Sequence, residues 1–148
     1  MQKYSYLRPL LTRSNLHAKI STTFQIRSFS AENKQVDYRD LSKTLDESKG
    51  NVLLYLHCTN PPSKQMTPIV HKVFSDFDGR YSLIKCCVDG ELAQEYVEEK
   101  FPGAGLPLLV CYKDGERIPI EHSMGFKIEQ MVKDYVRDGF KIPRSVGK

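Results

Sequence analysis

The chain has 148 residues, of which 40% are hydrophobic and 27% are charged, and its formal net charge is +4. This length fits one packed domain with a short additional segment and excludes two full domains. No apolar run approaches the roughly 18 residues of a membrane-spanning helix, so we expect no transmembrane segment.

The positive charge is concentrated at the N-terminus. Five basic residues precede Glu32, the first acidic residue, and the remaining chain carries 17 Lys and Arg against 18 Asp and Glu. The part of the chain that we expect to fold is therefore close to neutral. A nucleic-acid-binding protein needs basic residues on the folded face that contacts phosphates, so no nucleic-acid partner is expected.

Residues 1–29 have the composition of a mitochondrial transit peptide, because they contain Arg, Ser and Thr with scattered apolar residues and no acid. The segment from Arg27 to Ala31 resembles a matrix-peptidase processing site, with cleavage expected between Phe29 and Ser30. A basic tail without a targeting role is the alternative. Import would place the protein in the mitochondrial matrix or on a matrix-facing surface.

Strand-sized and helix-sized segments alternate from residue 36 onward. Val52 to His57 is an unbroken apolar run, which is typical of a strand covered on both faces. In chain order, the expected elements are a helix over 37–48, a strand over 52–57, a helix over 63–77, a strand over 81–88, a helix that opens at 89–90, strands over 108–113 and 116–121, and a helix over 128–139.

Local sequence features predict how these elements are connected and arranged. The strand, helix and strand between residues 52 and 88 predict two parallel strands joined by a right-handed crossover. Asp114 and Gly115 predict a hairpin turn, and Pro119 confines its strand to an edge of the sheet. The last helix is expected to face the core with an apolar stripe at Ile128, Met131, Val132, Tyr135 and Val136.

These elements, in this order, resemble the thioredoxin family over about residues 36–140. Ser63 to Val70, with Pro68, is similar to the start of that family's active-site helix, and Gly105 to Pro107 is similar to its cis-proline loop. The resemblance implies an α/β fold with a mixed central sheet of four to five strands and helices on both faces. It also implies a cis bond between Leu106 and Pro107. Residues 30–35 then form a linker, and residues 141–148 form a flexible tail.

The chemistry of the family is missing from this sequence. A thioredoxin uses a thiolate at the N-terminus of its active-site helix and a second Cys three residues later, and these positions fall on Asn60 and Ser63. The buried acid of the family falls on Leu54, although Lys85 matches the family's lysine. We therefore expect no catalytic residues and no cofactor. If the protein is an enzyme, we expect it to be a thioredoxin-like oxidoreductase.

Cys58 is the one weak redox candidate, because it lies in the loop before this helix and could form mixed disulfides as monothiol relatives do. A small, half-buried residue at the strand end is the alternative. The other three cysteines are expected to be core residues, because free Cys packs as a small hydrophobe. No spacing of His or Cys predicts a metal site. These three cysteines are Cys86, Cys87 and Cys111.

A binding surface is the function that survives the loss of the thiols. In members of the family, the backbone before the cis-proline docks extended peptide segments. The corresponding surface here consists of Asn60, Pro61, Pro62, Leu106 and Pro107. A proline that only fixes the fold is the alternative for Pro107.

The sequence therefore predicts a redox-inactive, thioredoxin-like mitochondrial protein. It would act as a binding or accessory subunit of a larger assembly, such as a respiratory complex, through a protein partner. A monothiol thiol–disulfide protein that uses Cys58 is the alternative, and a peptide-binding chaperone would use the same surface with a transient partner.

Overall fold

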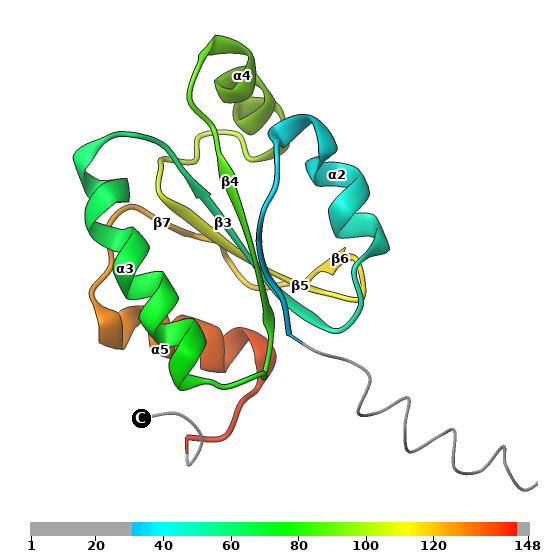
Figure 1. Ribbon diagram of the computed structural model, residues 1–148, viewed down its shortest axis with the longest axis vertical. Coiled ribbons are helices and arrows are strands. Elements are labelled where there is room, and N and C mark those ends of the chain that lie inside the picture. The colour runs from blue at the N-terminus through cyan, green and yellow to red at the C-terminus, as the bar shows by residue number, and fades with distance from the viewer. Residues whose placement is uncertain (1–30, 145–148) are drawn as a thin grey trace, which may run out of the picture. The chain divides into compact units, whose positions relative to one another are not determined.

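The computed structural model describes residues 31–144. The expected transit peptide and the last four residues of the expected tail lie outside this range. The elements, labelled as in Figure 1, are β2 (Asn33–Gln35), α2 (Tyr38–Glu47), β3 (Asn51–His57), α3 (Pro61–Asp76), β4 (Ser82–Cys87), α4 (Glu91–Lys100), β5 (Leu108–Lys113), β6 (Glu116–Arg117), β7 (Ser123–Met124) and α5 (Glu129–Phe140). Within the described range, no helix has the length and apolar character needed to cross a membrane.

A mixed sheet of six strands forms the centre of the molecule. Its order is β2-β4-β3-β5-β6, and β7 also pairs with β5. Strands β2 and β3 run parallel to β4, whereas β3, β6 and β7 all run antiparallel to β5. The predicted thioredoxin-like α/β fold is confirmed, including the parallel pair at its centre and the cis Leu106–Pro107 bond.

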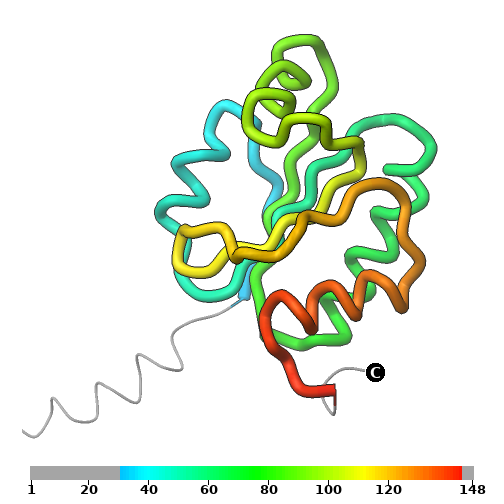
Figure 2. Tube along the Cα trace, turned by 180° about the vertical axis from the view of Figure 1, so that it is seen from behind, coloured from blue at the N-terminus to red at the C-terminus, as the bar shows by residue number. Residues whose placement is uncertain are grey.

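Strand β3 supplies side chains to both faces of this sheet. Leu53 and Tyr55 belong to a core covered by α3 and α5, whereas Leu54 and Leu56 belong to a second core covered by α2 and α4. The two helix pairs lie on opposite sides of the strands in Figure 1 and again in the reverse view of Figure 2. A strand covered on both faces needs a continuous apolar run, which is the pattern that the sequence displays.

Side-chain caps fix where two of the helices begin. Asp37 caps α2, because its Oδ1 accepts the backbone N–H of Arg39 at 2.9 Å. Asn60 caps α3 in the same way, and Pro61 and Pro62 occupy the first helical positions, where a missing N–H costs nothing. The carboxyl end of β3 is thereby joined to the start of α3 by only a few residues.

Two short strands were missed by the sequence analysis. Residues 33–35, which we expected in a linker, form the edge strand β2 against β4. The expected strand over 116–121 is interrupted after β6, because Pro119 has no N–H for the ladder, and pairing with β5 resumes at β7. Strands of two or three residues are too short to show a periodic pattern.

The expected flexible tail also needs correction at its start. Lys141 ends α5 in the left-handed conformation, and the N–H of Ile142 donates to the carbonyl of Arg137 at 3.1 Å. This is the geometry of a Schellman motif, which directs the following apolar residue back onto the helix. Ile142 is accordingly buried in the core under α3 and α5.

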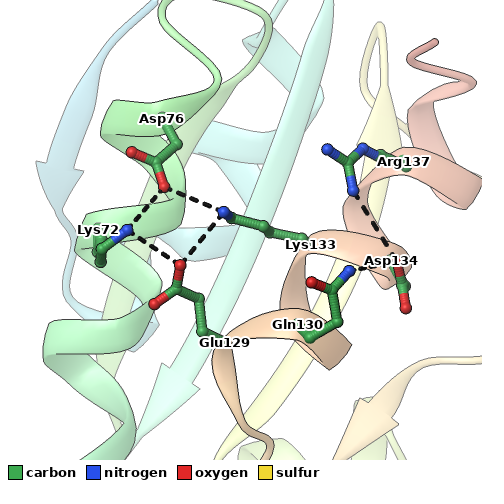
Figure 3. Close-up of polar contacts among 7 residues, drawn as sticks. All are labelled: Lys72, Asp76, Glu129, Gln130, Lys133, Asp134 and Arg137. Atoms are coloured by element: carbon green, nitrogen blue, oxygen red, sulfur yellow. Dashed lines mark hydrogen bonds and ion pairs between the residues drawn. The ribbon is translucent and has the colours of Figure 1, made fainter. Parts of the chain in front are cut away.

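A ring of four charged side chains joins α3 to α5 (Figure 3). Lys72 lies 3.0 Å from Asp76 and 2.9 Å from Glu129, and Lys133 contacts the same two carboxylates at 3.4 and 3.2 Å. The Lys133 side chain is only 7% exposed. Its position between two carboxylates therefore compensates a charge that would otherwise be costly to bury.

We predict that Gly139→Ala destabilises the protein, although Ala is the better helix former by about 1 kcal/mol. A Cβ at this position in α5 would lie 2.6 Å from Sγ of Cys111 and 3.1 Å from Cδ1 of Ile120. Overpacking of this kind typically costs about 1 to 3 kcal/mol. The free energy of unfolding, measured with urea, should fall, whereas the exposed neighbouring change Asp138→Ala should alter it by less than about 0.5 kcal/mol. A stabilised Gly139→Ala protein would contradict the close packing of α5 on β5.

Candidate functional site

The N-terminus of α3 lies at the carboxyl end of β3, where the sequence places the two positions that carry thiols in the thioredoxin family. Asn60 is the N-cap residue of α3, and its Oδ1 accepts the backbone N–H of Ser63 at 3.0 Å. This hydrogen bond satisfies one of the N–H groups that a helix leaves unpaired at its start. The side chain at the first thiol position is therefore a structural cap.

Ser63, at the second thiol position, is buried with 1% exposure. Its Oγ accepts the backbone N–H of Cys58 at 3.2 Å, and its carbonyl accepts the hydroxyl of Tyr55 at 3.1 Å. A second hydroxyl, that of Thr67, donates to the same carbonyl at 2.9 Å. These contacts tie the first turn of α3 to the end of β3 without any sulfur.

The loop between β3 and α3 is also held from the side of β4. Asp89 accepts the N–H and the hydroxyl of Thr59 on one carboxylate oxygen and the thiol of Cys87 on the other, at 3.1, 3.2 and 3.2 Å. These hydrogen bonds keep the pKa of Asp89 below its usual value. Neither Asp89 nor Cys87 was identified as a site residue from the sequence.

The structure corrects the expectation for one cysteine and supports it for two. Cys87, the last residue of β4, is exposed. Cys86 and Cys111 are buried, and burial raises the pKa of each thiol to about 12. Cys58 is half-buried, with its Sγ 3.8 Å from Oγ of Ser63.

A group of basic side chains lies on the α3 face of the sheet around Lys85, the residue that matches the thioredoxin family's lysine. Leu54 is fully buried in the core under α2 and α4, and Lys85 is half-buried beside α3. Nζ of Lys85 lies 3.3 Å from Nε2 of His71, which must accept because an ammonium group only donates. His71 is half-buried in this position.

His57 completes this group at the last position of β3. Its ring stacks on Tyr55 with centroids 5.0 Å apart, and among the described residues its buried Nε2 has no hydrogen-bond partner. Burial and the charge of Lys85 lower the pKa of His57, and the same two causes lower the pKa of His71. Both imidazoles are therefore held in the neutral form more strongly than an exposed histidine.

The expected binding residues meet at one end of the sheet but differ in exposure. Pro61 is exposed, Asn60, Pro62 and Leu106 are half-buried, and Pro107 is buried. The carbonyl of Pro107 accepts the N–H of Gly125 at 2.8 Å, so the proline loop is fixed to the end of β7. Pro107 therefore supports the surface from below, and the contact with a partner would fall to its neighbours.

Four further apolar side chains are exposed, and none of them was identified as a site residue from the sequence. Met124, Phe126, Ile128 and Met131 are between 41 and 55% exposed. The pattern placed Ile128 and Met131 on the buried stripe of the last helix. In the structure Ile128 is the N-cap of α5, whereas Val132 and Val136 form the buried stripe.

No metal site is formed by the described part of the chain, because it contains no group of three or more His, Cys, Asp or Glu placed to hold an ion.

No known family model matches the chain. A thioredoxin of Staphylococcus saprophyticus is 27% identical to it over 75 residues, which are 51% of this chain and 67% of that protein. A thioredoxin of Staphylococcus haemolyticus is 30% identical over 66 residues, which are 45% of this chain and 59% of that protein. The chain is related to the thioredoxins. The sequence relationship covers about half of this chain, and the thioredoxin-like fold continues beyond it.

We predict that the stability of this thioredoxin-like protein falls as the pH is lowered from 7.5 to 5.5. His57 and His71 have pKa values below the usual 6.5, so the unfolded chain binds more protons than the folded chain once the pH falls to that value. The loss begins near pH 6.5 and continues until the pH reaches the lowered pKa values. Carboxylates contribute little here, because their ordinary pKa values lie near 4.

Urea unfolding midpoints at pH 7.5, 6.5 and 5.5 measure this effect. The decrease should become smaller in His57→Gln, and also in Lys85→Met, because the charge of Lys85 lowers the pKa of both histidines. A midpoint that stays constant or rises on acidification would show that these imidazoles are not held neutral by the fold.

Proposed function

We propose that this chain is a redox-inactive, thioredoxin-like mitochondrial protein that binds a protein partner as an accessory subunit of a larger assembly, such as a respiratory complex. The observation that carries the proposal is the structure at the start of α3. Asn60 and Ser63 stand at the two thiol positions, and both have hydrogen-bonded structural roles.

Thiol–disulfide exchange at this helix needs two sulfur atoms. One thiolate attacks the substrate disulfide, and a second thiol resolves the mixed disulfide. An amide and a buried hydroxyl can do neither. Leu54, at the counted position of the family's acid, is an apolar residue of the core under α2 and α4 and supplies no carboxylate.

Docking is supported by the surface that remains. Leu106, Pro62 and Pro61 are accessible beside the α3 terminus, and Met124 and Phe126 continue the apolar surface along β7 and the segment after it. In residues 31–144, the Leu106 backbone N–H and carbonyl have no hydrogen-bond partner, so both remain available to an extended segment. Apolar side chains on a rigid base bind at a low cost in conformational entropy.

The mitochondrial part of the proposal rests on residues 1–29. Their basic, acid-free composition and the expected cleavage after Phe29 are the supporting features. The described part of the chain, which follows them, carries the surface that would meet the partner.

We predict that the protein, with dithiothreitol as the reductant, does not reduce insulin disulfides above the background measured without protein. The double change Asn60→Cys and Ser63→Cys, made in a Cys58→Ser background, should produce measurable activity. The restored thiols would stand at a helix N-terminus, where the helix dipole favours a thiolate. Turbidity from the released insulin chain measures the rate. Insulin reduction by the unmodified protein would contradict the proposal.

Docking can be tested separately with changes at exposed positions. We predict that Phe126→Glu combined with Met124→Glu reduces the amount of the protein that co-purifies with its assembly from mitochondria by about tenfold or more, since buried hot-spot contacts each contribute about 2 kcal/mol. Both side chains are exposed, so the unfolding free energy should stay within about 0.5 kcal/mol.

Leu92→Glu is the matched control for this experiment. Leu92 is 68% exposed on α4, which lies apart from α5 in both views of the chain (Figures 1 and 2). Association that is lost in Leu92→Glu, or retained in the double variant, would argue against a partner on this surface.

A monothiol role for Cys58 is the alternative, and it rests on the place of this half-buried sulfur beside the start of α3. A mixed disulfide trapped on Cys58 in mitochondria and absent in Cys58→Ser would favour it. Assembly that survives Cys58→Ser but not the double change on the apolar surface would favour docking.

A further inference from the structure

Two cysteines that the family's chemistry does not use lie at the ends of neighbouring strands. Strands β3 and β4 run parallel, and their last residues, His57 and Cys87, are register partners. Cys58 directly follows His57. Paired residues on adjacent strands lie about 4.8 Å apart, and one residue along a strand adds about 3.3 Å. The diagonal from Cys58 to Cys87 is therefore about 6 Å, within the range of about 4.4 to 6.8 Å that disulfides require between Cα atoms.

Both sulfur atoms point to the α3 face of the sheet. Cys87 shares the face of its partner His57, whose ring stacks on Tyr55, and the hydroxyl of Tyr55 bonds to α3. Regular alternation would turn Cys58 to the other face. However, β3 ends at His57, and Sγ of Cys58 lies 3.8 Å from Oγ of Ser63 in α3.

The thiols of Cys58 and Cys87 are also accessible, unlike those of the other two cysteines. Cys58 is half-buried and Cys87 is exposed, whereas Cys86 and Cys111 are buried. The pKa of the Cys87 thiol is raised by burial and by its hydrogen bond to Asp89, and to a smaller extent by the charge of the Cys58 thiolate.

We propose that Cys58 and Cys87 form a reversible intramolecular disulfide when the protein meets a low-molecular-weight disulfide such as oxidised glutathione. The thiolate of Cys58 attacks one sulfur of the oxidant and releases one glutathione thiolate. The thiolate of Cys87 then attacks the Cys58 sulfur and releases the second glutathione. Two protein thiols are oxidised, one glutathione disulfide is reduced to two thiols, and the protons pass through solvent.

The order of the two attacks follows from the surroundings of Cys87. Its thiol donates to Asp89 and has a raised pKa, which makes it the poorer first nucleophile. The new bond would replace the hydrogen bond to Asp89 and tie the loop before α3 to the end of β4.

The experiment uses the full chain, equilibrated in glutathione buffers from reducing to oxidising, quenched by alkylation and digested without reductant. Mass spectrometry should find a peptide that joins Cys58 to Cys87, increasing at least about tenfold toward the oxidising buffer. The link should vanish in Cys58→Ser and in Cys87→Ser and persist in Cys86→Ala. Fragmentation of the wild-type peptide between Cys86 and Cys87 makes the same assignment without any variant.

Separate glutathione adducts on Cys58 and Cys87, or a link through Cys86 or between two chains, would overturn the inference. The outcome is independent of the proposed function. A protein that does not reduce insulin can still form one disulfide within its own chain. Insulin reduction by the unmodified protein would contradict the proposed function but not the Cys58–Cys87 disulfide.

Discussion

Strand β3 is the constraint on which the rest of the molecule depends. Its side chains enter two cores in alternation, so a shift of one residue in its register would exchange the contents of the two cores. Its pairing with β4 and β5 is fixed by that requirement. The position of its last residue, His57, then determines where Cys58 and the start of α3 must lie, because only three residues separate the strand from the helix.

The start of α3 shows how a thiol site can be replaced by structural contacts. A helix N-terminus favours negative charge and needs acceptors for its first N–H groups. Asn60 supplies an acceptor without a charge, and the buried hydroxyl of Ser63 accepts from the chain that leads into the helix. Both residues therefore stabilise the terminus directly. Sulfur is a weak hydrogen-bond acceptor, so restoring thiols at these positions would weaken the same contacts.

The fold could be predicted from the sequence because its signals are local. The apolar run of β3, the cap Asp37 and the Asp114-Gly115 turn each specify an element without reference to distant residues. The candidate site was only partly predictable. Asn60 and Ser63 were located by counting from Pro68, but the hydrogen bond between Thr59 and Asp89 joins residues 30 positions apart. Periodicity carries no information about such contacts.

The errors in the sequence analysis have a common physical cause. Ile128 has the spacing of a buried stripe, but it precedes the helix. Cys87 lies in a sequence that is typical of a buried strand, but β4 ends at that residue. In each case the local pattern continues past the point where the covering element stops. Apolar and reactive side chains therefore become exposed at the ends of elements.

Support from a buried residue explains why a binding surface can survive the loss of the thiols. Pro107 is buried beneath its neighbours whatever the chemistry at the helix terminus. The accessible residues, such as Leu106 and Phe126, are held in place by that support, including the hydrogen bond from Gly125 to the carbonyl of Pro107. A partner would meet a surface that is already ordered, so the free energy of its apolar contacts would not be spent on fixing the loops.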